Sequence, residues 1–174
     1  MSSVKIVNGS CADQEVDAIV NAANRYLMSG SGICGAIYKE AGYIELNEAC
    51  KNIKTPLNDG EAVITPSFNI KNCKYIIHAV GPNFSIDRNS FDKLMLAYYN
   101  SLLVLKENNL HSISFPLISS GIYAGDLENP VRVSVSECLH AYNKFIEEFD
   151  YEINVKLCCF SAKEVEEAKK VFYT

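Results

Sequence analysis

Residues 75–80 read Tyr-Ile-Ile-His-Ala-Val, a run in which nearly every side chain is apolar. A continuous apolar run of this length is typical of a strand that is covered on both faces. Five further short runs rich in β-branched residues are expected to be strands, and helical patterns separate most of them. This alternation predicts an α/β fold with helices on both faces of one sheet. The five runs are Val4–Val7, Asp17–Val20, Ala62–Thr65, Ser112–Phe115 and Ile153–Phe160.

Helical periodicity, with apolar side chains recurring every three or four positions, appears in four stretches. The third is expected to begin at Pro130 with Asn129 as its N-cap, because proline is favoured in the first turn of a helix. The last begins with Ser161 and Glu164 in a capping-box pattern. Gly42 is expected to break or bend the first helix. The four stretches are residues 33–50, 91–105, 130–146 and 161–172.

Length and composition favour one globular domain over residues 1–174. The chain is 48% hydrophobic and 21% charged, close to the globular average, which excludes a disordered or collagen-like chain. Its formal net charge is -5, and no basic run provides the face that phosphate-driven nucleic-acid binding needs. A phosphate-bearing ligand is therefore expected to be held by backbone N–H groups and helix N-termini. Nucleic acid is not an expected partner.

The seven cysteines have irregular spacing and include no C-x-x-C pair. An odd, unpatterned set fits a reduced compartment, and we expect a cytoplasmic monomer. No Cys and His residues have the tight spacing of a metal site, so neither a metal nor a cofactor is expected. No apolar run reaches the length of a membrane span, and residues 1–5 lack the apolar core of a signal peptide.

Two loops that follow expected strands are candidates for ligand binding and catalysis, since ligands bind beyond the carboxyl ends of strands in open α/β sheets. The first loop, residues 21–33, includes Gly-Ser-Gly at 30–32 and leads into a helix. Small residues allow close approach of a ligand to the backbone, and the helix dipole adds partial positive charge, so this loop can hold an anion. A flexible glycine entry to a helix is the alternative.

The second loop, residues 116–126, is another cluster of small residues directly after a strand. Its N–H groups are suited to the other side of a pyrophosphate, although an ordinary surface turn would look the same. Phe160, at the end of the last strand, is a candidate platform for stacking a base; a core aromatic is the alternative. Together these three features predict a cleft for a nucleotide diphosphate sugar.

Four motifs follow one another along the chain: Val16-Asp17-Ala18-Ile19-Val20-Asn21-Ala22-Ala23-Asn24, Gly30-Ser31-Gly32-Ile33-Cys34-Gly35-Ala36-Ile37, Ile77-His78-Ala79-Val80-Gly81-Pro82 and Phe115-Pro116-Leu117-Ile118-Ser119-Ser120-Gly121-Ile122-Tyr123. In this order they resemble the motifs of macrodomains, the ADP-ribose-binding family, most closely the branch of MacroD-type hydrolases and viral macrodomains. The resemblance covers about residues 4–172, and it implies a three-layer α/β/α sandwich with a mixed sheet of about six strands.

The resemblance also implies roles for particular residues. Asn24 and Tyr123 would act at the distal ribose, close to the scissile bond, and Phe160 would lie against the adenine. The remaining expected ligand-binding residues belong to the two loops and to the turn after the first strand. They are Ser10, Cys11, Ala23, Gly30, Ser31, Gly32, Ile33, Cys34, Ser119, Ser120, Gly121 and Ile122.

Two positions depart from the family pattern. Gly9-Ser10-Cys11 stands where the family has Gly-Asp-Ile, and a neutral hydroxyl accepts the adenine amino group less strongly than a carboxylate, by very roughly 1 kcal/mol. Cys34 stands where MacroD-type hydrolases have Asp, which implies a substrate-assisted route in which the diphosphate and backbone position the water. A structural role for Cys34 is favoured over a nucleophilic one, and His78 is expected to be a satisfied strand histidine.

The implied function is hydrolysis of mono-ADP-ribose esters from modified acidic side chains, and of O-acetyl-ADP-ribose. The partners would be ADP-ribose and mono-ADP-ribosylated proteins. A non-catalytic ADP-ribose reader is the first alternative, favoured by Cys34, whereas Asn24, the glycine loop and Tyr123 favour the enzyme. Binding of poly-ADP-ribose or RNA is a further alternative, against which the negative net charge argues.

Overall fold

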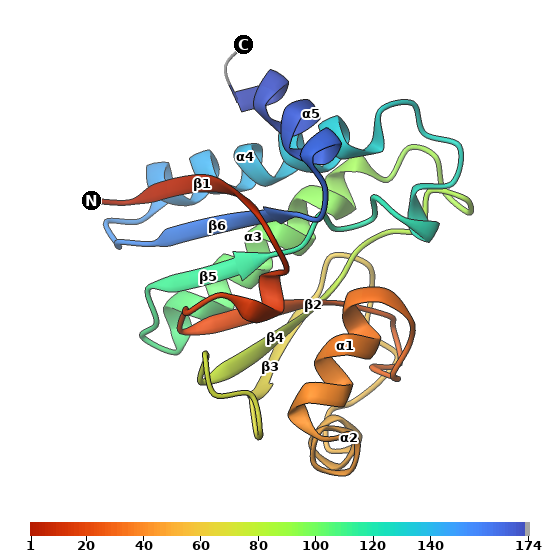
Figure 1. Ribbon diagram of the computed structural model, residues 1–174, viewed down its shortest axis with the longest axis vertical. Coiled ribbons are helices and arrows are strands. Elements are labelled where there is room, and N and C mark those ends of the chain that lie inside the picture. The colour runs from red at the N-terminus through yellow and green to blue at the C-terminus, as the bar shows by residue number, and fades with distance from the viewer. Residues whose placement is uncertain (173–174) are drawn as a thin grey trace.

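The computed structural model describes residues 1–172 and consists of one six-stranded sheet with helices on both faces (Figure 1). The strand order is β1-β6-β5-β2-β4-β3, and every neighbouring pair is parallel except β3 and β4. The predicted mixed sheet of a three-layer α/β/α sandwich is therefore confirmed. The strands are β1 (Ser3–Asn8), β2 (Ala18–Ala23), β3 (Ala62–Pro66), β4 (Tyr75–Val80), β5 (Ser112–Phe115) and β6 (Asn154–Cys159).

Two hydrophobic layers lie on the two faces of the sheet. Helices α1 (Gly32–Ala41) and α2 (Tyr43–Lys51) pack on one face. Helices α3 (Phe91–Glu107), α4 (Pro130–Glu148) and α5 (Ala162–Phe172) pack on the other. Alternate residues of β4 enter the two layers, Ile76 and Val80 into the first and Ile77 and Ala79 into the second. The continuous apolar run of β4 follows from this double coverage.

Several predicted boundaries agree with the structure. Gly42 separates α1 from α2 with a φ of +106°, and Pro130 is the first residue of α4. Ser161 and Glu164 form the expected capping interactions: the Glu164 N–H donates to Ser161 Oγ at 3.1 Å, and the Phe160 N–H donates to Glu164 Oε1 at 2.8 Å. No helix among residues 1–172 combines the length and apolarity that a membrane crossing requires.

Two predicted strand ends are wrong. The strand expected to end at Val20 continues to Ala23, because Asn21 pairs in register with His78 and bonds to its ring. The last strand ends at Cys159, so Phe160 lies outside it. Asn129 is the N-cap residue of α4 as expected, but its backbone is left-handed and its side chain makes no cap hydrogen bond.

Candidate functional site

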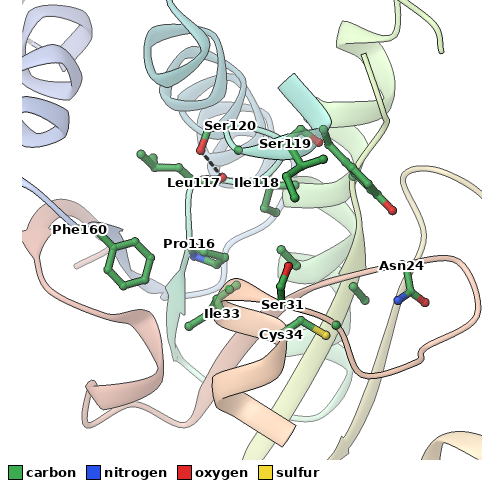
Figure 2. Close-up of a pocket in the computed structure, with 18 of the residues that line it drawn as sticks. Asn24, Ser31, Ile33, Cys34, Pro116, Leu117, Ile118, Ser119, Ser120 and Phe160 are labelled. Atoms are coloured by element: carbon green, nitrogen blue, oxygen red, sulfur yellow. Dashed lines mark hydrogen bonds between the residues drawn. The ribbon is translucent and has the colours of Figure 1, made fainter. Parts of the chain in front are cut away.

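A cavity of about 490 Å³ lies beyond the carboxyl ends of the central strands, between the loop that leads into α1 and the loop that follows β5 (Figure 2). Phe160 and Asn24 stand at opposite ends of the view. The cavity thus lies where the two sequence loops were expected to meet. It is lined by Ala22, Ala23, Asn24, Gly30, Ser31, Gly32, Ile33, Cys34, Gly81, Pro116, Leu117, Ile118, Ser119, Ser120, Gly121, Ile122, Tyr123, Cys158, Phe160 and Glu164.

Asn24 folds the first loop through its own side chain. Its Oδ1 accepts hydrogen bonds from the Tyr26 N–H at 3.1 Å and the Met28 N–H at 3.0 Å. Its Nδ2 donates to the Met28 carbonyl at 2.8 Å. The amide of Asn24 therefore shapes the loop that borders the cavity, in addition to standing in the cavity lining.

The loop ends at the N-terminus of α1, which faces the cavity with unpaired backbone donors. The first N–H groups of a helix have no intrahelical acceptor, and together with the helix dipole they favour an anion. Ser31, the N-cap residue, makes no side-chain cap hydrogen bond. Gly32 has a φ of +62°, a conformation that a residue with a Cβ rarely adopts. Gly32, Ile33 and Cys34 form this first turn and line the cavity.

Cys34 is held as a neutral thiol. Its side chain is 6% exposed, and Sγ donates to the Met28 carbonyl at 3.6 Å. Burial raises the pKa of Cys34, although contacts with Asn21 and the Gly30 backbone partly oppose this increase. Because the thiolate is the nucleophilic form of cysteine, this environment favours the structural role of Cys34.

A buried polar chain crosses β2, β4 and β3 and reaches Cys34 at the start of α1 through Asn21. Asn21 Nδ2 lies 3.1 Å from His78 Nδ1, and His78 Nε2 lies 2.9 Å from Thr65 Oγ1. An amide N–H can only donate, so His78 accepts at Nδ1 and carries its proton on Nε2. Complete burial lowers the pKa of His78 to about 4, which keeps the ring neutral. His78 is thus a satisfied strand histidine, whereas the buried Asn21 Oδ1 has no partner among the described residues.

The second loop is tied to the layer that contains α3 and α4. Tyr98 Oη accepts from the Ile118 N–H at 3.0 Å, and Ser134 Oγ donates to the Ile118 carbonyl at 2.7 Å. Ser119 Oγ donates to the Pro82 carbonyl at 2.7 Å. At Gly81 a Cβ would overlap the side chains of Ile118 and Ser119, so glycine permits the close approach of this loop to the end of β4.

Phe160 closes the opposite end of the cavity and is 64% exposed. A core aromatic was the alternative, and the exposure of this ring agrees better with a platform for a base. The side chain of Glu164 lines the same cavity, and its Oε1 accepts from the Phe160 N–H. The capping interaction of α5 therefore also fixes the backbone of Phe160.

Most predicted site residues line the cavity, but Ser10 and Cys11 are absent from the part of the lining that the structure describes. Ser10 Oγ accepts from the Ala12 N–H at 3.2 Å, as the N-cap of a short 3-10 helix (Cys11–Asp13). Cys11 is buried, and its Sγ donates to the Val20 carbonyl at 3.4 Å. Both side chains thus already have partners within the protein.

Seven lining residues were not predicted as site residues. Of these seven, only Cys158 and Glu164 have polar side-chain atoms, and the other five contribute backbone and apolar surface. The direct signal for Glu164 was the capping box, because it predicts that the Glu side chain turns back toward the start of the helix. The seven are Ala22, Gly81, Pro116, Leu117, Ile118, Cys158 and Glu164.

The electrostatics of the cavity come mainly from the backbone. No Lys or Arg occurs among the lining residues that the structure describes, and the carboxylate among them, Glu164, lies beside Phe160. Residues 1–172 contain no group of three or more His, Cys, Asp or Glu side chains arranged to hold a metal ion. Anion binding in this cavity therefore depends on N–H groups such as those at the start of α1.

Comparisons with known proteins agree with this fold. A family model described as "Macro domain" matches residues 20–134. O-acetyl-ADP-ribose deacetylase 1 of Pantoea vagans is 34% identical over 168 residues, which cover 94% of this chain and 94% of that protein.

Two solved structures are similar over nearly the whole chain. The Oceanobacillus iheyensis macrodomain with ADP has a TM-score of 0.88 and 32% identity, covering 98% of this chain and 90% of that one. The Trypanosoma brucei macrodomain in complex with ADP-ribose has a TM-score of 0.83 and 28% identity, covering 97% of this chain and 68% of that one. With the family model matching well over half of its length, the chain belongs to the macrodomain family.

Proposed function

We propose that the cavity binds ADP-ribose and that the chain hydrolyses mono-ADP-ribose esters on acidic side chains of modified proteins, as well as O-acetyl-ADP-ribose. One observation carries this proposal. The uncapped N-terminus of α1 faces a second small-residue loop across a cavity whose described lining contains no Lys or Arg. That arrangement suits a diphosphate held by main-chain amides.

The cavity also accounts for the two ends of such a ligand. The exposed ring of Phe160 offers a stacking surface for the adenine. Asn24, at the opposite end, lies where the distal ribose would be. A volume of about 490 Å³ falls in the usual range for small-molecule sites.

Hydrolysis at this site would depend on how the attacking water is positioned. For an ester on an acidic side chain, a water oxygen bonds to the anomeric carbon of the distal ribose, the bond from that carbon to the ester oxygen breaks, and the electron pair leaves with the carboxylate. For O-acetyl-ADP-ribose, the water oxygen bonds to the acetyl carbonyl carbon, the bond from that carbon to the ribose oxygen breaks, and the ribose oxygen leaves with the electron pair and takes up a proton. The water proton passes to solvent or to a phosphate oxygen. Cys34 is neutral, and Glu164 lies beside Phe160, so the bound diphosphate and the backbone would orient the water.

A non-catalytic reader is the second candidate function, and the neutral Cys34 is the observation that favours it. A reader would bind ADP-ribose with the same loops and would leave modified proteins intact. Binding and turnover therefore have to be measured separately.

Titration calorimetry tests the binding, and incubation with a labelled mono-ADP-ribosylated protein tests the turnover. ADP-ribose is expected to bind more tightly than AMP or ADP, and equal affinities would contradict the proposed site. Asn24→Ala is expected to slow label release more than it weakens ADP-ribose binding. Binding without label release by the unaltered chain would establish the reader instead.

Asn83→Ala is the matched control for Asn24→Ala. Asn83 Oδ1 accepts from the Ser85 N–H at 3.0 Å, the same turn contact that Asn24 makes with Tyr26. Asn83 is not among the lining residues. If Asn83→Ala slows label release as much as Asn24→Ala does, loss of a turn contact is sufficient to explain the slower release, and the catalytic role of Asn24 is wrong.

A further inference from the structure

Glu164 stands at the end of the cavity that contains Phe160, in the first turn of α5. Its side chain is partly buried and lines the cavity. Oε1 accepts from the Phe160 N–H at 2.8 Å, and the Glu164 N–H donates to Ser161 Oγ at 3.1 Å. These two bonds fix the backbone and the carboxylate of Glu164, so the carboxylate has a defined place beside the expected base platform.

The carboxylate of Glu164 keeps most of its acceptor capacity free. An ionised carboxylate has about four sites that accept hydrogen bonds, and within residues 1–172 only the Phe160 N–H donates to this one. No cation in the described part of the chain forms an ion pair with it. The remaining sites, those of Oε2 included, can therefore accept from a ligand in the cavity.

A ligand group with suitable donors is expected at this end. The inference rests on the proposed function, in which the adenine stacks on Phe160 and the diphosphate lies at the start of α1. The proximal ribose, which carries the adenine, is bonded to both, so it lies between these two places. Its hydroxyls are hydrogen-bond donors, and a carboxylate that accepts from a ribose 2′-hydroxyl is a recurring arrangement in nucleotide-binding α/β folds.

We propose that Glu164 binds the hydroxyls of the proximal ribose and thereby excludes ADP-ribose that carries a phosphate on the 2′-hydroxyl of that ribose. The carboxylate accepts from the free hydroxyl through a charge-assisted hydrogen bond. A 2′-phosphate replaces this donor with a negatively charged group, which the carboxylate repels. No Lys or Arg among the described lining residues offsets that repulsion.

The adenine amino group is the competing donor at this end of the cavity. The hydrogen bond to the Phe160 N–H holds the Glu164 carboxylate at the main chain, at the root of the ring and not at its free edge. The neighbouring hydroxyls of a ribose present two donors side by side, which match the two oxygens of a carboxylate. Both features favour the ribose, and an analogue with a changed base tests the alternative.

The test compares the unaltered chain, Glu164→Gln and a control, Glu61→Gln. Glutamine keeps the size of the side chain and an acceptor for the Phe160 N–H, and it also occurs in capping boxes, so the substitution removes chiefly the charge. Glu61 is a matched control, because its Oε1 accepts from the Asn58 N–H at 2.8 Å, its side chain is also partly buried, and it does not line the cavity.

Titration calorimetry measures the affinity of each chain for three ligands: ADP-ribose, 2′-phospho-ADP-ribose, and the analogue with hypoxanthine in place of adenine. The unaltered chain is expected to prefer ADP-ribose over the 2′-phosphorylated form about a hundredfold, and Glu164→Gln should lower this preference about tenfold. ADP-ribose itself should bind Glu164→Gln severalfold less tightly, because a neutral acceptor replaces a charged one. The control should keep both the preference and the affinity.

Three results would overturn the inference. An absent preference in the unaltered chain, or one that Glu164→Gln leaves unchanged, would show that this carboxylate does not exclude the 2′-phosphate. An equal change in Glu61→Gln would assign the effect to the net charge of the molecule. A larger change in the adenine-to-hypoxanthine ratio than in the 2′-phosphate preference would show that Glu164 binds the base.

Failure of the proposed function has a different signature. If the unaltered chain binds ADP-ribose, each of the three contrary results overturns the role of Glu164 alone. Because all three ligands are followed by binding, the outcome is the same for a hydrolase and for a reader. If ADP-ribose does not bind the unaltered chain, the proposed function and this inference both fail.

Discussion

The two loops that border the cavity are held in different ways. The first, residues 24–31, is bonded along its length by the Asn24 amide, which makes three bonds to Tyr26 and Met28. It is also tied to the layer of α1 and α2, because Leu27 is buried there and its carbonyl accepts from the Tyr38 hydroxyl. The second, residues 116–125, is held by Tyr98, Ser134 and the segment that follows β4. The first loop thus combines bonds from one amide of its own with support from one hydrophobic layer, whereas the second depends chiefly on the other layer.

This difference predicts which substitutions disturb each loop. The first loop should be sensitive to changes at Asn24 and Gly32 within or next to it, and the second to changes at buried positions far along the chain such as Tyr98.

The largest expected effect is on the first loop. Gly32→Glu combines an unfavourable positive φ with a carboxylate at the expected diphosphate position, and we expect roughly a thousandfold loss of ADP-ribose affinity. Gly32→Gln adds a side chain of similar size without the charge, and it should lose less ADP-ribose affinity than Gly32→Glu. Titration calorimetry measures both. Undiminished affinity in Gly32→Glu would mean that the phosphate site is elsewhere.

A pH effect distinguishes the supports of the two loops. The pKa of buried His78, whose partner Asn21 contacts Cys34 at the start of α1, is lowered from 6.5 to about 4. The unfolded chain therefore binds the proton first, and His78 contributes stability above pH 6.5 that is lost progressively as the pH falls to about 4. We expect a loss of about 2 kcal/mol in the free energy of unfolding by pH 5.

Urea unfolding of the unaltered chain and of His78→Gln at pH 7 and pH 5 measures this loss. The variant should show a smaller difference between the two pH values, and His140→Gln, at an exposed site, should keep the full difference. Tyr98, beneath the second loop, has a pKa raised well above its ordinary value by burial, so acid leaves that support unchanged. Equal pH dependence in the unaltered chain and His78→Gln would contradict the role given to His78.

The support of the second loop is tested by Tyr98→Phe. The change leaves the Ile118 N–H without its acceptor, and we expect the free energy of unfolding to fall by about 1–2 kcal/mol. ADP-ribose affinity should fall severalfold because the loop is released. Tyr142→Phe is the control, since the Tyr142 hydroxyl makes no hydrogen bond within residues 1–172. A loss confined to stability, with affinity unchanged, would show that the loop keeps its place without this bond.

The smallest expected effect concerns the reaction itself. If the diphosphate and backbone position the water, Cys34→Asp should change the rate of label release by less than about fivefold. Cys34→Ser, which keeps the volume and the neutral donor, is the comparison. A rate gain of about a hundredfold would instead indicate a general-base route.

The sheet and the cavity were predictable because periodicity and small-residue loops carry strong signals. Tyr75–Val80 is apolar at nearly every position because both faces are covered, and the two loops lie where strands end. The extension of β2 through Asn21 was not predictable, because an asparagine seldom continues a buried strand unless a partner such as His78 satisfies it. That partner comes from another strand, and spacing along the chain does not reveal it.

Two other differences have similar physical causes. Ser10 and Cys11 were expected in the ligand site, but they do not line the described cavity; Ser10 Oγ accepts a local cap bond, and Cys11 Sγ donates to a backbone carbonyl. Glu164 was treated as a helix signal alone, although the side chain that caps α5 also reaches the cavity. A capping residue beside a predicted loop is therefore a candidate site residue as well as a helix signal.

The claim that main-chain amides of both loops hold the diphosphate is tested most directly by amide chemical shifts during titration with ADP-ribose. A diphosphate held by these amides should produce large shifts at Gly32, Ile33 and Cys34 together with Ser120, Gly121 and Ile122, and adenosine should produce much smaller ones at the same groups. Saturable binding of ADP-ribose that leaves those amides unmoved would contradict it.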